Sequence, residues 1–293
     1  MATKQATKQA TEIKLAHSPD SDDAFMFYAL ATNKVRVDGL KFAHTLSDIE
    51  TLNRAAESEV YDVTAISFAA YPYLREKYAL LDCGASFGDN YGPLIVSQKP
   101  MRREDLAGSK IAVPGLRTSA YLSLKLFEPR VEPIVIAFDK IVDAVKDGTV
   151  PAGLLIHEGQ LMFPQEGLHR VADLGQWWHE QTGLPLPLGG NAIRRALGPE
   201  TGRKVSQAIR ASVEYGLEHR DAALNYAMQF AREMETELAD QFVGMYVNQW
   251  TLGYGEKGRQ AVREFLGRGV KAGLIPETGE IDFIGAETEQ TRA

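Results

Sequence analysis

Cysteine is almost absent from this sequence, and several features that define common protein classes are missing altogether. Cys83 is the only cysteine among 293 residues, which excludes an intrachain disulfide and a cysteine-based metal site. No run of about 18 apolar residues occurs, so no transmembrane helix is predicted. The glycine motifs of dinucleotide-binding folds, phosphate-binding loops and serine hydrolases are also lacking. We therefore expect no metal ion, no nucleotide cofactor and no membrane-spanning segment.

Basic residues are outnumbered by acidic ones, 32 to 39, which gives a formal net charge of −7. This balance argues against nucleic acid or an anionic membrane as a partner. Residues 1–11 are polar and repetitive and lack the apolar core of a secretory signal, so we expect a disordered tail and a cytoplasmic protein. A monomer and a homodimer both fit the sequence.

Short apolar runs alternate with helical patterns in the first half of the chain, which predicts an α/β fold with a mainly parallel sheet. The expected strands are residues 13–17, 40–45, 61–66, 92–97, 110–113, 131–137 and 153–156. A helix is expected at 68–77, and a capping box of Ser47 and Glu50 begins another. Beyond Pro199 the pattern changes to long amphipathic helices, expected at 199–218, 221–232, 235–250 and 256–272.

Polar residues come directly after four of these strands. They are residues 18–23, Ser67, residues 114–119 and His157. Because ligands of open α/β sheets bind outside the carboxyl ends of the strands, this placement predicts one convergent site.

Thr118 and Ser119 stand where a glycine-containing loop meets the start of a helix. Free N–H groups and the helix dipole favour an anion there, and the two hydroxyls could add hydrogen bonds. Thr118 could equally serve only as the N-cap of the helix, and Ser67 presents the same choice after its own strand. The functional interpretation predicts a cleft for a small anionic molecule.

An acidic loop follows the first strand. Ser18, Asp20, Asp22 and Asp23 could bind sugar hydroxyls or a cation, or could cap the following helix and complement its dipole. His157 follows a buried strand, where an imidazole can act as a general base near neutral pH. The alternative is a structural histidine held by hydrogen bonds.

Five segments carry a family resemblance. They are residues 92–96 (GPLIV), 112–121 (AVPGLRTSAY), 152–158 (AGLLIHE), 173–189 and 246–248 (YVN). In all of them the chain resembles 1,4-dihydroxy-6-naphthoate synthase, an enzyme family of the futalosine route to menaquinone, and 152–158 is similar to the family's catalytic-histidine segment. The similarity covers nearly all of residues 12–275.

The resemblance implies a type II periplasmic-binding-protein-like fold, in which two α/β lobes hold a ligand between them and the C-terminal part is helical. Lobe 1 would comprise residues 12–98 and 195–293, and lobe 2 residues 99–194. The implied activity is that of a carbon–carbon lyase. It would convert cyclic dehypoxanthine futalosine to 1,4-dihydroxy-6-naphthoate and a sugar-derived fragment in menaquinone biosynthesis, without a cofactor.

The resemblance also assigns roles to individual residues. His157 would be the general base that takes a proton and starts the fragmentation. Thr118 and Ser119 would bind the carboxylated substrate. Ser67 would line the opposite lobe, together with Ser18 and Asp23 of the first loop.

The first loop departs from the family pattern. Where the family commonly has Ser-Pro-Cys-Pro-Asn-Asp-Thr, this chain keeps only Ser18, Pro19 and Asp23. Its extra carboxylates would place negative charge in a cleft meant for a carboxylated substrate. A non-catalytic binding protein for small carboxylates is therefore one alternative function, and the dehydration of chorismate, a sister reaction of the same pathway, is another.

Overall fold

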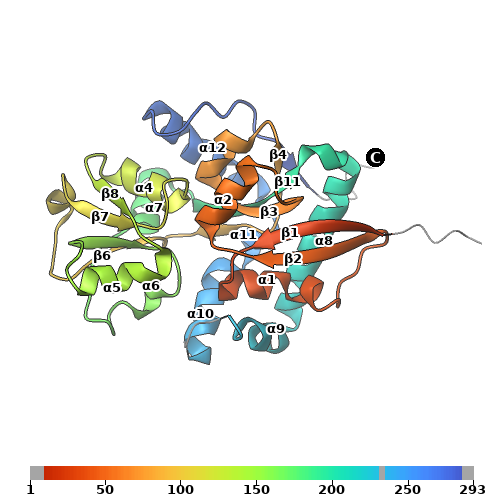
Figure 1. The fold of residues 1–293 in the computed structure, drawn as a ribbon, viewed down its shortest axis with the longest axis horizontal. Helices are drawn as coiled ribbons and strands as arrows, with labels where there is room; N and C mark the ends of the chain where they lie inside the picture. The colour runs from red at the N-terminus through yellow and green to blue at the C-terminus, as the bar shows by residue number, and fades with distance from the viewer. Residues whose placement is uncertain (1–9, 231–234, 286–293) are drawn as a thin grey trace, which may run out of the picture.

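Two β-sheets form the framework of this computed structural model, which describes residues 10–230 and 235–285. The larger sheet contains β1 (Thr11–His17), β2 (Leu40–Leu46), β3 (Val63–Ser67), β4 (Tyr78–Leu81), β5 (Ser86–Gly88), β11 (Leu186–Arg194) and β12 (Phe283–Ile284). Their order is β12-β4-β11-β3-β1-β2, and β5 pairs with β11. With the helices packed on it, this sheet forms lobe 1, on the right of Figure 1.

The smaller sheet forms lobe 2, on the left of Figure 1. Its strands are β6 (Leu94–Ser97), β7 (Lys110–Val113), β8 (Glu132–Val135), β9 (Ala152–Leu155) and β10 (His169–Asp173). They lie in the order β10-β6-β9-β7-β8. Two α/β lobes are thus present, as the sequence predicts.

Helices cover both sheets. In lobe 1, α1 (Ser21–Ala31) packs against α8 (Gly198–Glu218), α9 (Arg220–Ala227) and α10 (Thr236–Tyr246), while α12 (Gly255–Lys271) packs on β11. Figure 1 shows α9 and α10 below α1 and α12 on the opposite side of the lobe. The shorter helices are α2 (Ile49–Glu57), α3 (Tyr71–Leu74), α4 (Ser119–Phe127), α5 (Ile141–Lys146), α6 (Gly159–Met162), α7 (Leu174–Thr182) and α11 (Gln249–Leu252).

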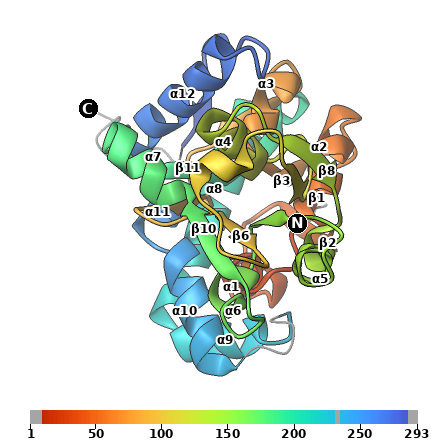
Figure 2. The same ribbon diagram turned by 90° about the vertical axis from the view of Figure 1, so that its left-hand side faces the viewer.

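The central strands of the smaller sheet, β6, β7 and β9, are buried on both faces, and successive side chains point to opposite faces. On β7, Ile111 and Val113 pack in the same apolar cluster as Trp178 of α7, whereas Ala112 packs with Ile141 of α5. Figure 2 looks onto this lobe and shows α4 and α7 apart from α5 and α6. None of the helices in the described part of the chain is long and apolar enough to cross a membrane.

The sheets are mixed rather than mainly parallel. Parallel pairs join β1 to β2 and β3, β7 to β8 and β9, and β12 to β4. In contrast, β11 runs antiparallel to β3, β4 and β5, and β6 runs antiparallel to β9 and β10. The prediction of a mainly parallel sheet is wrong for these strands, since β6 and β11 each enter their sheet from the other lobe and not through a strand–helix–strand crossover within one sheet.

The chain passes between the lobes at different residues than the sequence suggested. β6 was expected in lobe 1 but pairs within the smaller sheet, and β11 was expected in lobe 2 but pairs within the larger one. The crossings therefore lie between β5 and β6 and between α7 and β11. Of the tail expected at residues 1–11, positions 1–9 lie outside the described residues, and Thr11 already belongs to β1.

Two expected helices are shorter than their patterns. Residues 68–77 form a 3-10 turn (Phe68–Ala70) followed by the single turn of α3, and the helix expected at 235–250 ends at Tyr246 before Asn248 caps α11. The cap of α2 also differs. Asp48 is the N-cap and its side chain accepts from Thr51 N–H, because the helix begins one residue later than a capping box on Ser47 requires.

Candidate functional site

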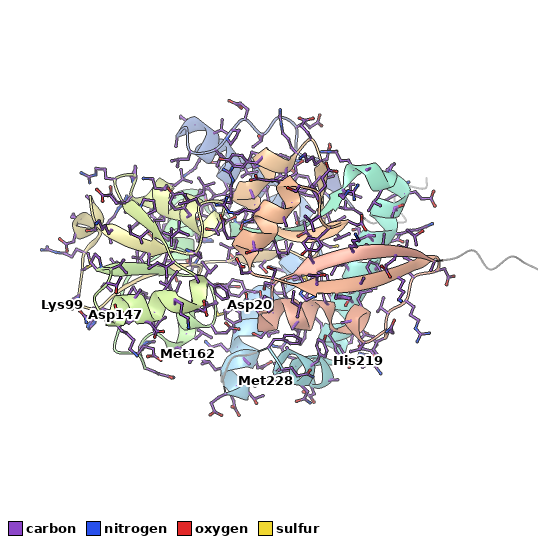
Figure 3. The ribbon with its side chains drawn as sticks, viewed as in Figure 1. Asp20, Lys99, Asp147, Met162, His219 and Met228 are labelled. Atoms are coloured by element: carbon purple, nitrogen blue, oxygen red, sulfur yellow. The ribbon has the colours of Figure 1, made fainter. Side chains whose placement is uncertain are left out.

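A cavity of about 120 Å³ lies between the two lobes. It is bordered by the residues that follow β1, by the end of β3, by the start of α4 and by β11. Figure 3 shows Asp20, one of its lining residues, at the boundary between the lobes. The carboxyl ends of parallel strands from both sheets thus meet at one site, as the sequence predicts.

Five of the six predicted site residues line this cavity. They are Ser18, Asp23, Ser67, Thr118 and Ser119. The sixth, His157, is buried at 8% exposure but is not a lining residue, although its neighbours Ile156 and Gln160 are. The structure therefore brings the expected binding groups together and leaves the expected base behind the wall of the cavity.

The acidic loop folds back on itself at the start of α1. Ser18 N–H donates to Asp23 Oδ2 at 2.7 Å, and the Ser18 hydroxyl donates to Asp20 Oδ2 at 2.9 Å. Asp20 is the N-cap of α1 by position but makes no side-chain cap bond, and Asp22 and Asp23 lie in the first turn. The carboxylates face the positive end of the helix dipole, which offsets part of their mutual repulsion.

Burial keeps this acidic wall less charged than its composition suggests. Desolvation, reinforced by the charges of Asp23, Asp20 and Glu158, raises the pKa of Asp22 well above its usual value. Desolvation and Asp20 also raise the pKa of Asp23 to about 7, against the hydrogen bond from Ser18 that lowers it. A protonated carboxyl donates a hydrogen bond. The wall can therefore accept a carboxylated ligand near neutral pH at less electrostatic cost than three ionised carboxylates would impose.

Thr118 and Ser119 begin α4, and both hydroxyls already have partners inside the protein. Thr118 Oγ1 donates to Gly115 O at 2.9 Å and accepts from Tyr121 N–H at 3.1 Å. Ser119 Oγ donates to Leu188 O and accepts from Ala69 N–H at 3.2 Å. The N-cap interpretation of Thr118 is thus confirmed. An anion at this end of the cavity would be held chiefly by the helix dipole and the backbone N–H groups of the first turn.

Ser67 ends β3 and is held by one side chain. Asn53 of α2 donates from Nδ2 to Ser67 Oγ at 3.1 Å, and its Oδ1 accepts from Ser67 N–H at 2.8 Å. The pair is buried, at 1% and 3% exposure. The Ser67 hydroxyl proton is consequently oriented away from Asn53, which allows it to donate toward a ligand.

Both ring nitrogens of His157 bond to backbone groups. Gly159 N–H donates to Nδ1 at 2.8 Å, so the ring proton lies on Nε2, which donates to Phe138 O at 3.1 Å. A Cβ on Gly159 would lie 2.7 Å from the ring, so glycine allows this close approach. The structural-histidine alternative describes this arrangement, because the one basic lone pair of the ring, on Nδ1, is occupied by Gly159 N–H.

Hydrogen bonds between the lobes close the cavity on two sides. On one side the Ser21 hydroxyl donates to Glu158 Oε1 at 3.2 Å, and the Tyr246 hydroxyl of α10 donates to Gln160 Oε1 of α6. On the other side Arg117 N–H donates to Glu50 Oε2 at 3.1 Å, and the Arg117 guanidinium lies 3.5 Å from the centroid of the Tyr73 ring. Arg117 therefore joins the lobes and does not line the cavity. A ligand between closed lobes would be shielded from water.

Several lining residues were not predicted as site residues. They are Gln160, Leu188, Gly189, Gly190, Asn191, Phe242 and Tyr246. Four of them belong to β11, whose glycines and proline give no strand pattern in the sequence. Tyr246 stands in a segment that carries the family resemblance, and Gln160 follows the predicted His157 by three residues. The sequence therefore contained a weak indication that these two residues line the site.

The arrangement of two α/β lobes around a cavity is that of the periplasmic-binding-protein-like fold. The alkanesulfonate-binding protein of Xanthomonas axonopodis pv. citri, solved with MOPS, has this fold, with a TM-score of 0.69 at 11% identity over 92% of this chain and 96% of that one. A Candida albicans protein described as having the generic periplasmic-binding-protein fold matches with a TM-score of 0.68 at 12% identity, over 96% of this chain and 99% of that one.

The chain belongs to the menaquinone biosynthesis family, whose model matches residues 13–271. It is 40% identical over 272 residues to a 1,4-dihydroxy-6-naphthoate synthase of Thermus thermophilus, covering 93% of this chain and 99% of the relative. The corresponding enzyme of Streptomyces coelicolor is 39% identical over 277 residues, covering 92% and 97%. A crystal structure of an Archaeoglobus fulgidus protein matches with a TM-score of 0.87 at 46% identity, over 90% of this chain and 98% of that one.

Proposed function

We propose that this protein is a carbon–carbon lyase that converts cyclic dehypoxanthine futalosine to 1,4-dihydroxy-6-naphthoate and a sugar-derived fragment. The observation that carries the proposal is identity of about 40% with two naphthoate synthases over nearly their whole length. The cavity supports it, because its lining combines a helix N-terminus suited to a carboxylate with a wall of hydroxyl and carboxyl groups. A cleft that excludes water suits a fragmentation started by proton removal.

His157 is the proposed general base. It follows β9, and Ile156 beside it lines the cavity. To take a proton, the ring must exchange the Gly159 N–H bond at Nδ1 for one from the substrate. Substrate binding would supply this exchange, since closure of a site around its ligand commonly completes the catalytic geometry.

Asp23 is the rival base within the same function. It lines the cavity, and burial raises its pKa to about 7, which is the range in which a carboxylate serves as a base near neutral pH. The two candidates differ in where they stand, because Asp23 faces the cavity and His157 reaches it only after its ring moves.

The purified protein incubated with cyclic dehypoxanthine futalosine tests the function. We expect 1,4-dihydroxy-6-naphthoate to accumulate with time, measured by mass spectrometry against an authentic standard. Tight binding without turnover would instead identify a carboxylate-binding protein. Turnover of chorismate alone would identify the dehydratase. Either result would overturn the proposal.

Three substitutions test which residue is the base. His157→Gln keeps a neutral, hydrogen-bonding side chain, and we expect it to lower kcat by a factor on the order of 10² to 10⁴. His169→Gln, at an exposed histidine of β10, should leave kcat unchanged. If His157→Gln retains full turnover while Asp23→Asn loses it, the base is the carboxylate.

A further inference from the structure

Two buried side-chain amides line the cavity and keep polar atoms without partners. Asn191 is 2% exposed and Gln160 is 5% exposed. Asn191 Oδ1 and Gln160 Nε2 make no hydrogen bond to any residue in the described ranges 10–230 and 235–285. A buried polar atom without a partner lowers stability, so native proteins hold few of them and those few call for an explanation.

The orientation of the Asn191 amide is determined by its backbone neighbour. Asn191 Nδ2 lies 2.6 Å from Gly84 O, and a carbonyl oxygen can only accept, so the donating atom must be the nitrogen. Gly84 has a φ of +68°, and a Cβ there would lie 2.6 Å from Asn191 Nδ2. Glycine therefore makes the close approach of the amide possible, and Oδ1 is left as the unpaired acceptor.

The Gln160 amide is anchored from the other lobe. Tyr246, which is 3% exposed, donates from its hydroxyl to Gln160 Oε1 at 2.8 Å. This bond occupies the oxygen and leaves the NH₂ group as a donor at the cavity. The residues that line the same cavity thus include an unpaired acceptor on β11 of lobe 1 and an unpaired donor on α6 of lobe 2, and a ligand reaches these two buried atoms only as the lobes close around it.

The groups around these amides favour hydroxyls as their partners. Gly189 lines the cavity near Asn191 and carries no side chain, so a ligand can approach the backbone of β11 there, whereas the space beside Gly190 is filled by Tyr254 and Phe68. The carboxyls of Asp22 and Asp23 border the same cavity and exchange hydrogen bonds well with hydroxyls. A hydroxyl both donates and accepts, so adjacent hydroxyls satisfy one acceptor and one donor together.

We propose that Asn191 and Gln160 recognise the hydroxyl-bearing, sugar-derived part of the substrate. Asn191 Oδ1 accepts a hydrogen bond from a substrate hydroxyl, and Gln160 Nε2 donates one to a substrate oxygen. This inference rests on the proposed function, because the substrate it concerns is the one named in that proposal. It adds the residues that distinguish this substrate from the naphthoate product, which lacks the sugar-derived part.

The test compares the substrate with the product in one assay. Asn191→Leu and Gln160→Met remove the amides at similar side-chain size. We expect each to lower kcat/KM for cyclic dehypoxanthine futalosine by about tenfold to a hundredfold, mainly through KM. The inhibition constant of 1,4-dihydroxy-6-naphthoate should change less than about twofold. Gln176→Met, at an exposed glutamine of α7, should leave both values unchanged.

The assay distinguishes failure of the proposed function from failure of the recognition role. Absence of naphthoate from the wild type would overturn the proposed function and, with it, the substrate named here. An active wild type with variants that keep kcat/KM, or that weaken substrate and product equally, would overturn the recognition role alone. Thermal unfolding of each variant identifies one that does not fold, and the other amide then decides the question.

Discussion

The Tyr246 hydroxyl donates a hydrogen bond to Gln160 Oε1 at 2.8 Å and joins α10 of lobe 1 to α6 of lobe 2. Tyr246→Phe removes this bond and leaves the Gln160 oxygen buried without its partner. We expect the variant to lose about 1–3 kcal/mol in the free energy of unfolding, measured by urea titration. Tyr226→Phe is the control, since Tyr226 is held by ring contacts with Tyr28 and Phe230, which phenylalanine keeps. Equal stability of wild type and Tyr246→Phe would contradict the expectation.

Replacing Gly175 or Gly267 by alanine is expected to change the stability of the protein in opposite directions. A Cβ on Gly175 would collide with the backbone carbonyl of Tyr91, where α7 packs against the chain crossing between the lobes. We expect Gly175→Ala to destabilise the protein by about 1–3 kcal/mol. Gly267 lies in α12 with nothing within 4 Å of such a Cβ, so Gly267→Ala should stabilise by about 0.5–1 kcal/mol. Calorimetric melting temperatures that shift in the same direction would refute the argument.

His17 makes the fold sensitive to acid. It stacks on Phe27 at 4.4 Å, and burial together with the neighbouring His44 lowers its pKa to about 3. The folded state keeps the ring neutral, while the unfolded chain binds a proton below about pH 6.5, so this stability is present above pH 6.5 and is lost toward pH 3. As the pH falls through that window, the free energy of unfolding of the wild type should decrease by up to about 1.4 kcal/mol per pH unit more than that of His17→Gln. His169→Gln, at an exposed position, should show the wild-type dependence.

Asp22 lowers the stability of the fold as the pH rises, which is opposite to the effect of His17. Because its pKa is raised in the folded state, the stability it contributes is complete below about pH 4 and is lost as the pH rises and the buried group ionises. Asp22→Asn cannot ionise, so its stability should exceed that of the wild type at pH 8 and approach it at pH 4. The gain is about 1.4 kcal/mol for each pKa unit of the shift. Asp38→Asn, at an exposed carboxylate, should show no such gain in the same denaturation series.

Thr118 caps α4, and two variants separate this structural role from the binding role proposed for it. Thr118→Ala removes the cap bond to Tyr121 N–H, and Asp173→Ala removes the cap bonds to Gly175 and Gln176 on α7. Each should cost about 1 kcal/mol of stability. Only Thr118 lines the cavity, so only its variant should weaken the binding of 1,4-dihydroxy-6-naphthoate in calorimetric titration. Equal affinities of the two variants would remove Thr118 from the binding site.

Local patterns in the sequence predicted much of the site. A polar residue after an apolar run can be recognised without knowing the fold, and Ser18, Asp23, Ser67, Thr118 and Ser119 all line the cavity. Strand β11 could not be found this way, because its glycines and proline hide the alternation and its place between β3 and β4 depends on residues more than 100 positions away. Asn191 was missed for the same reason.

The sequence by itself determined the α/β class, the two lobes, the strand ends where the polar residues gather and the family, since each depends on local periodicity or on a run of characteristic residues. Only the tertiary structure decided the antiparallel entry of β6 and β11 and the pairing of Tyr246 with Gln160. It also decided the orientation of His157 and the raised pKa of Asp22. These features arise from burial and from contacts between distant segments, which come into being only when the lobes pack together.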